Sequence, residues 1–177
     1  ENVFEIENYA DATDLVEIEW LENIYTNCEN SGVVFNKRLL KSFHTALKTS
    51  DWSPLTVLAG VSGTGKSLLP EYYCKFGGIY FKSMAVQPDW DSPQSLFGFF
   101  NSIDNRFEPE PLLRFLVQCT EDEKYKDYMS IVLLDEMNLA RVEYYLSDFL
   151  SVIETRDRKE NGDIETEPLV DVDYYKD

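Results

Sequence analysis

The stretch GVSGTGKSLLP, from Gly60 to Pro70, decides how this chain of 177 residues is best interpreted. Its first eight residues fit the phosphate-binding pattern G-x-x-x-x-G-K-[ST] without a mismatch. The apolar run Leu55–Ala59 before it predicts a buried strand, and the residues leading to Gly77-Gly78 after it predict a helix over 67–76. Because the pattern binds phosphate where it links a strand to a helix, we favour a nucleotide site over a purely structural glycine turn.

The residue types in this loop suit a bound triphosphate. Glycines let the backbone curl so that successive N–H groups converge on phosphate oxygens, and the following helix directs its positive dipole end at the same anion. We expect Lys66 to reach the β- and γ-phosphates and the Ser67 hydroxyl to ligate Mg²⁺. Pro70 is a small conflict, since it removes one hydrogen bond from the helix. The predicted nucleotide-binding residues are Gly60, Val61, Ser62, Gly63, Thr64, Gly65, Lys66 and Ser67.

A second stretch, IVLLDE from Ile131 to Glu136, supplies acidic partners for the loop. Four apolar residues before two carboxylates predict a buried strand that presents both acids at its carboxyl end, where open α/β sheets bind ligands. We expect Asp135 to hold the Mg²⁺ shell and Glu136 to polarise the water that attacks the γ-phosphate. The alternative is a strand that runs into an exposed acidic turn, and the upstream loop disfavours it.

Three stretches together resemble the AAA+ superfamily of NTPases. They are GVSGTGKS, VQPDWDSPQSLFGFFN (residues 86–101) and LLDEMNLARVEYYLSDFLSVIETR (residues 133–156). More narrowly, they resemble the branch that contains the McrB-type restriction NTPases and the dynein-related, midasin-like ATPases. The more particular mark of that branch is the D-E-[IML]-N element, here Asp135-Glu136-Met137-Asn138. The resemblance spans about residues 35–156.

This resemblance implies a fold, an activity and a setting. The implied fold is an α/β P-loop NTPase, a three-layer αβα sandwich with a parallel sheet. The implied activity is Mg²⁺-dependent hydrolysis of ATP, or of GTP as in McrB-type members, with Glu136, Lys66 and Asn138 as catalytic residues. The implied setting is a ring-forming homo-oligomer, and a McrC-like nuclease subunit is the protein partner that the resemblance suggests.

Parts of the family pattern are missing from this sequence. The related domains carry a sensor strand, an arginine finger and a helical lid after the acidic pair, and none is found before Asp177. In that fold the sensor strand lies between the phosphate-loop strand and the acidic strand, so its absence predicts a gap in the sheet. We therefore expect a core that is incomplete at the C-terminus, with weak nucleotide binding and slow hydrolysis by this chain alone.

Charge and local patterns suggest two regions. The net charge is −17, and nine acids but no base precede Lys37. We predict an acidic N-terminal extension over residues 1–33 with a helix near 14–28, followed by a core over 34–177 that ends in an acidic hairpin at Asn161-Gly162-Asp163. Within the core, the patterns predict helices over 35–48, 112–119 and 142–153 and a strand over 79–86. An anionic chain cannot grip a phosphate backbone, so direct nucleic-acid contact is disfavoured.

The apolar runs, the cysteines and the single histidine disfavour several classes of function. No apolar run approaches the roughly 20 residues of a membrane span, and three widely spaced cysteines indicate reduced thiols, so we expect a cytoplasmic protein without membrane contact. His44 is the only histidine, which disfavours a zinc site or a catalytic triad, and we expect it at the surface or at the edge of the core. Two other functions stay open: a nucleotide-switched assembly module with little turnover, and, more weakly, a small-molecule kinase.

Overall fold

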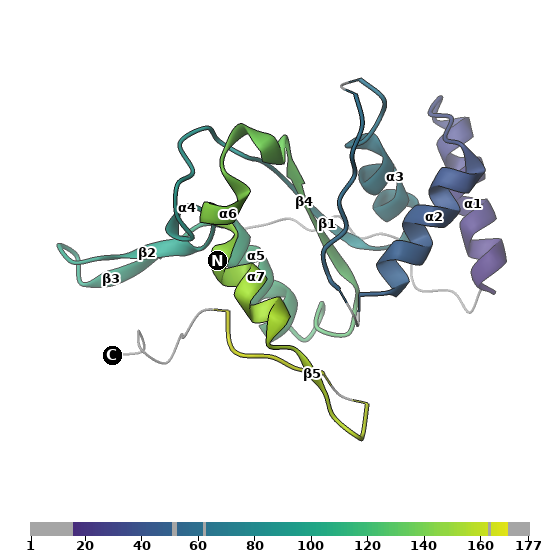
Figure 1. Cartoon of the computed structure of the whole chain (residues 1–177). Helices are drawn as coiled ribbons and strands as arrows, with labels where there is room; N and C mark the ends of the chain where they lie inside the picture. Colours follow the sequence, from purple (N-terminus) through teal and green to yellow (C-terminus); the bar gives the residue numbers. More distant parts are fainter. Residues whose placement is uncertain (1–15, 51–52, 62, 163, 170–177) are drawn as a thin grey trace. The chain divides into compact units, whose positions relative to one another are not determined.

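The computed structural model describes residues 16–50, 53–61, 63–162 and 164–169. The chain is mixed α/β, as Figure 1 shows, and it divides into two compact units. Unit 1 comprises residues 1–84 and 127–135, and unit 2 comprises residues 85–126 and 136–177. In the described part of the chain, no helix is long and apolar enough to cross a membrane.

The described part of unit 1 contains three helices: α1 (Glu17–Asn30), α2 (Lys37–Lys48) and α3 (Leu68–Gly77). The Asn36 side chain caps α2 by accepting a hydrogen bond of 2.8 Å from the Arg38 backbone N–H, which would otherwise lack a partner. Helix α3 ends at Gly78, which adopts the left-handed conformation (φ 71°) that commonly ends helices. The predicted helices over 14–28, 35–48 and 67–76 are therefore confirmed, with boundaries shifted by a few residues.

The core of unit 1 lies where the three helices pack. Tyr73 is at its centre, with its ring edge-on to those of Trp20 and Phe43 at centroid distances of 5.4 and 5.1 Å. Helices α1 and α3 approach closely at Gly77, where an added Cβ would lie 2.7 Å from Cζ2 of Trp20. The buried cluster comprises Leu21, Ile24, Cys28, Phe35, Leu40, Phe43, Leu69, Tyr73, Cys74 and Ile79.

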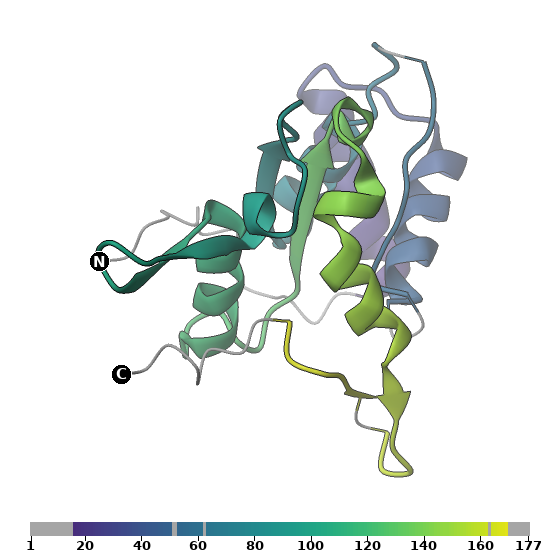
Figure 2. The same cartoon turned by 60° about the vertical axis from the view of Figure 1, so that its left-hand side comes forward.

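A small parallel sheet contains the strand that ends at Asp135. It pairs β1 (Tyr80–Ala85) with β4 (Ser130–Asp135), and both strands were predicted from their apolar runs. Figure 2 shows β4 as the long green strand. The residues of β4 are half-buried, whereas the sequence predicts a fully buried strand. In a two-stranded sheet each strand has only one neighbour, so less of its surface is covered.

The strand predicted over Leu55–Ala59 is wrong. This segment is irregular, and Val57 is 59% exposed. A strand exists only through hydrogen bonds to a neighbouring strand, and among the described residues the parallel sheet consists of β1 and β4 alone. The structure is therefore a mixed α/β arrangement with a small parallel sheet, and the three-layer sandwich is not shown.

Unit 2 combines short helices with two antiparallel hairpins. Strands β2 (Gly98–Asn101) and β3 (Arg106–Pro109) pair from Gly98↔Pro109 to Asn101↔Arg106, a hairpin that the sequence did not predict. A Cβ at Gly98 would lie 2.3 Å from the Glu108 carbonyl oxygen, so the close strand approach requires glycine there. The remaining elements are α4 (Gln94–Phe97), α5 (Pro111–Glu121), η1 (Met137–Leu139), α6 (Val142–Tyr145), α7 (Ser147–Glu154), β5 (Asp157–Arg158) and β6 (Ile164–Glu165).

Five of these elements lie where the sequence predicted helices or a hairpin. Helix α5 confirms the helix over 112–119, with Pro111 in the first turn, where its missing N–H costs nothing. The single helix predicted over 142–153 is instead divided at Leu146 into α6 and α7. Strands β5 and β6 pair antiparallel on either side of Gly162, and Asp163 lies outside the described residues.

Candidate nucleotide-binding site

The glycine-rich loop joins the irregular segment 55–59 to helix α3. Gly63 and Gly65 have φ values of 78° and 81°, a left-handed conformation that residues with a Cβ rarely adopt. Nothing lies within 4 Å of a Cβ built at Gly63, so the requirement for glycine there comes from the backbone and not from crowding. Of the predicted binding residues, Ser62 lies outside the described residues. Left-handed residues of this kind occur in loops whose N–H groups converge on an anion.

Lys66 is held against its own loop. Its Nζ donates a hydrogen bond of 2.8 Å to the Val61 carbonyl oxygen, and the Thr64 hydroxyl donates to the same oxygen, also over 2.8 Å. Lys66 is half-buried, and the hydrogen bond from its ammonium group to the Val61 carbonyl oxygen is exposed. A phosphate oxygen can replace the carbonyl oxygen as its partner, with a stronger, charge-assisted hydrogen bond.

The structure brings Ser67 and Asp135 together. The Ser67 hydroxyl donates a hydrogen bond of 2.9 Å to Oδ1 of Asp135, and this contact is partly buried. Ser67 directly precedes α3 and Asp135 is the last residue of β4, so the contact joins the carboxyl end of a strand to the start of a helix. A hydroxyl and a carboxylate side by side suit Mg²⁺, which takes few protein oxygens and keeps water and phosphate oxygens as its other ligands.

Glu136 adopts an unusual backbone conformation. Its φ and ψ are 54° and 42°, in the left-handed region that costs a non-glycine residue roughly 1–2 kcal/mol. Its carbonyl oxygen accepts a hydrogen bond of 2.9 Å from the Leu139 N–H and so begins the turn η1. Glu136 and Asn138 are both exposed and both belong to unit 2, whereas Lys66, Ser67 and Asp135 belong to unit 1. Strained backbone of this kind is concentrated at functional sites.

His44 is buried, contrary to the prediction that it lies at the surface or the edge of the core. It is 9% exposed, and its Nδ1 and Nε2 lie 2.7 Å from the Tyr73 hydroxyl and 2.8 Å from Oε1 of Glu17. Lys48 donates to the other oxygen of Glu17 over 2.7 Å. The hydrogen bonds from Lys48 and from His44 hold the pKa of Glu17 below its usual value. This chain of contacts ties α3 to α1 and α2.

No sequence pattern indicates the His44 contacts, because its partners lie 27 and 29 residues away. Burial also raises the pKa of Tyr73, so its hydroxyl stays protonated at neutral pH. None of the four side chains in this set of contacts is an activated nucleophile. The described residues also contain no cluster of three metal-ligating side chains. The contacts of His44 connect α3, the helix after the glycine-rich loop, to α1 and α2.

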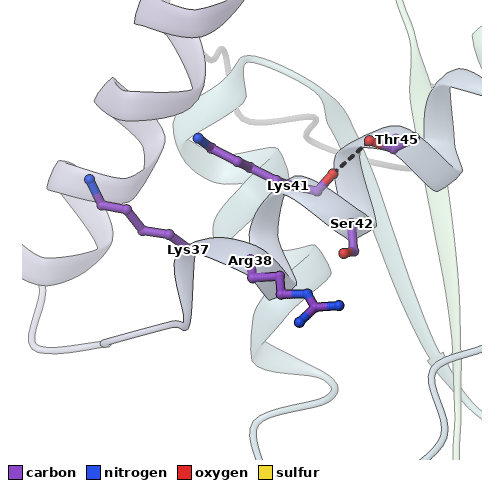
Figure 3. Close-up of a pocket in the computed structure, with 5 residues that line it drawn as sticks. All are labelled: Lys37, Arg38, Lys41, Ser42 and Thr45. Atoms are coloured by element: carbon purple, nitrogen blue, oxygen red, sulfur yellow. Dashed lines mark hydrogen bonds between the residues drawn. The ribbon is translucent and has the colours of Figure 1, made fainter.

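An open hollow of about 580 Å³ runs along α2 and is lined by polar residues (Figure 3). Its lining residues are Lys37, Arg38, Lys41, Ser42 and Thr45. Lys37 and Arg38 extend in opposite directions in Figure 3, and Lys37 is paired with Glu22 at 2.6 Å. The basic side chains thus do not converge on one point, and no residue of the phosphate loop lines the hollow. We therefore do not assign the nucleotide to it.

Comparison of the chain with protein-family models, with curated proteins and with solved structures found no match. The loop over 60–67, its contact with Asp135 and the conformation of Glu136 are therefore what supports the function proposed below.

Proposed function

We propose that this chain binds a nucleoside triphosphate with Mg²⁺ at the loop over residues 60–67 and takes part in its hydrolysis. The observation that carries the proposal is the hydrogen bond between Ser67 and Asp135. Each residue belongs to a separate sequence motif, and both were predicted to serve the same metal ion, Asp135 because the glycine-rich loop lies upstream of it. Their contact is the one that such a shared role requires.

Each residue has a distinct part in the proposed reaction. The loop N–H groups and Lys66 bind the phosphate oxygens, and Ser67 and Asp135 provide oxygen ligands for Mg²⁺. Mg²⁺ held by these two residues would supply positive charge that offsets the negative charge of the phosphate oxygens. Glu136 accepts a proton from the attacking water and orients it. Asn138, three residues after Asp135, is the remaining catalytic candidate.

The resemblance to the AAA+ superfamily extends this proposal. In this extension the chain is a nucleotide-hydrolysing core of the McrB-like and dynein-related branch, with the αβα sandwich of that superfamily. It works in the cytoplasm as a ring-forming oligomer and engages a McrC-like nuclease subunit or a related protein partner. The Asp135-Glu136-Met137-Asn138 element supports this narrower assignment.

A second candidate is an assembly module that binds nucleotide with little turnover. It is favoured by the charges in the two motifs, where Lys66 is the only basic residue of 60–67 and none occurs in 130–136. An arginine that stabilises the transition state contributes about 10³–10⁵ to the rate in related NTPases. Without such a group the chain would bind nucleotide far better than it hydrolyses it.

Calorimetric titration with ATP and with GTP, each in the presence of Mg²⁺ and of EDTA, tests the binding. Phosphate release under single-turnover conditions, with protein in excess, then tests the hydrolysis. We expect saturable binding that Mg²⁺ strengthens, followed by slow phosphate release. Binding without release would favour the assembly module, and the absence of binding to either nucleotide would refute both candidates.

A further inference from the structure

The turn that follows Glu136 is held by a buried tyrosine. The Tyr145 hydroxyl donates a hydrogen bond of 3.0 Å to the carbonyl oxygen of Met137, the first residue of η1. Tyr145 lies on α6, eight residues further along the chain, and both residues belong to unit 2. The bond therefore fastens a three-residue turn to a neighbouring helix.

Tyr145 itself is rigidly placed. It is fully buried, and its ring packs edge-on against that of Trp90 at a centroid distance of 5.4 Å. Helix α6 also contacts α4, which contributes the buried side chains of Leu96 and Phe97 to unit 2. Burial raises the pKa of the Tyr145 hydroxyl, so it remains a proton donor throughout the physiological range. A hydroxyl group fixed in this way can restrict the motion of the Met137 carbonyl group that accepts its hydrogen bond.

The turn η1 needs such a restraint because Glu136, the residue before it, has a strained backbone. Glu136 occupies the left-handed region, which an exposed glutamate leaves unless its surroundings keep it there. Two hydrogen bonds oppose a change of the Glu136 backbone out of this conformation. Leu139 N–H donates to the Glu136 carbonyl oxygen, and Tyr145 holds Met137, the next residue, by its carbonyl oxygen.

We infer that Tyr145 is a positioning residue for Glu136, acting through the Met137 carbonyl oxygen to keep the carboxylate in one orientation. This inference rests on the proposed function, because the orientation matters only if Glu136 activates water. Tyr145 makes no contact with substrate in this account. Its contribution is to the rate of hydrolysis, and nucleotide binding does not depend on it.

The test compares Tyr145→Phe with Tyr144→Phe in the full chain. The first change removes only the hydroxyl group and keeps the ring against Trp90. The second is the matched control, because Tyr144 is 46% exposed and its hydroxyl accepts a hydrogen bond from Arg141, not from the turn. Both variants are also made in a Glu136→Gln background.

Amide hydrogen exchange of Leu139, followed by NMR, reports on the turn without nucleotide. We expect protection in the wild type, exchange at least about threefold faster in Tyr145→Phe, and no change in Tyr144→Phe. Single-turnover hydrolysis reports on Glu136. We expect the rate constant to fall about three- to tenfold in Tyr145→Phe, with an unchanged half-saturating concentration. In the Glu136→Gln background, Tyr145→Phe should have no further effect.

The outcomes separate this inference from the function it rests on. An unprotected Leu139 amide in the wild type, or equal exchange in Tyr145→Phe and wild type, would overturn the inference without any assay of activity. So would an unchanged rate in Tyr145→Phe when Glu136→Gln is slow. If Glu136→Gln hydrolyses nucleotide like the wild type, or the wild type not at all, the role of Glu136 fails and the inference fails with it.

Discussion

Ser67 Oγ donates a hydrogen bond to Asp135 Oδ1 over 2.9 Å, although the two residues are 68 positions apart. The contact places a hydroxyl group from the start of α3 beside a carboxylate from the end of β4. Each side chain offers an oxygen, and each can exchange its present partner for a metal ion. The contact is therefore the structural basis for the predictions on nucleotide and Mg²⁺.

Asp135→Asn should weaken the effect of Mg²⁺ on nucleotide binding. The amide keeps the size of the side chain but loses the negative charge that holds the cation. We expect the affinity for the Mg²⁺-nucleotide complex to fall about tenfold, the scale of one charge-assisted interaction, while the affinity measured in EDTA stays as in the wild type. Calorimetric titration measures both values.

The control for Asp135→Asn is Asp127→Asn, which makes the same charge change at an exposed position of unit 1. It should leave the effect of Mg²⁺ unaltered. If Asp135→Asn and Asp127→Asn respond to Mg²⁺ alike, Asp135 does not serve the metal ion.

Glu136→Gln should keep Mg²⁺-nucleotide binding and slow hydrolysis by about 10²- to 10⁴-fold, because an amide cannot accept the proton of the attacking water. Phosphate release under single-turnover conditions measures the rate constant. Glu143→Gln, at an exposed position of α6, is the matched control and should hydrolyse nucleotide like the wild type. A parallel loss of binding in Glu136→Gln would show that Glu136 serves the nucleotide and not the water.

Local patterns predicted the elements that local chemistry determines. Pro111 at a helix start, Gly78 at a helix end and the apolar run before Asp135 each act within a few residues, and the structure has α5, α3 and β4 there. The glycine-rich loop over 60–67 is of the same kind, since glycine readily adopts the φ values of 78° and 81° found at Gly63 and Gly65.

The sequence predictions failed where an outcome depends on distant partners. Leu55–Ala59 has the composition of a strand but pairs with no other strand among the described residues. His44 finds Tyr73 and Glu17 on two other helices, which no spacing rule reveals. The break at Leu146 is a failure of another kind, because the contact there is local: the Ser147 hydroxyl donates to the Tyr144 carbonyl oxygen over 3.1 Å and competes with the helical bonds.

Gly77→Ala should destabilise unit 1 even though alanine is the better helix former. The added Cβ would lie 2.7 Å from Cζ2 of Trp20, whose indole N–H donates to the Gly77 carbonyl oxygen over 3.2 Å. We expect the free energy of unfolding to fall by about 1–3 kcal/mol, as for other overpacked sites, measured by urea denaturation. In a Trp20→Phe background the ring at position 20 is smaller, so Gly77→Ala should lower the free energy of unfolding by less. An equal penalty in both backgrounds would exclude the clash as its cause.

Cys74 should resist alkylation in the folded protein. Its side chain is fully buried, and burial raises the pKa of its thiol from 9.0 to about 12, so the reactive thiolate is about a thousandfold scarcer than in the unfolded chain. The raised pKa favours the folded state below pH 9, and this stabilisation is lost as the pH rises towards 12.

Iodoacetamide at pH 8 followed by peptide mass spectrometry measures the reactivity of each cysteine. We expect the half-buried Cys119 to be modified first, and Cys74 only as fast as the protein unfolds. Modification of Cys74 at the rate of Cys119 would mean that the packing of α3 against α1 is looser than the structure shows.

Fluorescent-nucleotide titration of the wild type and of Lys66→Ala tests the nucleotide site most directly. Lys66 is the only charged side chain of the loop, so its loss removes the one full positive charge available there to the phosphates. Lys75→Ala is the matched control, because that ammonium group lies over the rings of Tyr72 and Phe76 on α3. We predict saturable binding by the wild type and by Lys75→Ala, and none by Lys66→Ala. Binding by Lys66→Ala with the affinity of the wild type would contradict the assignment of residues 60–67 as the nucleotide site.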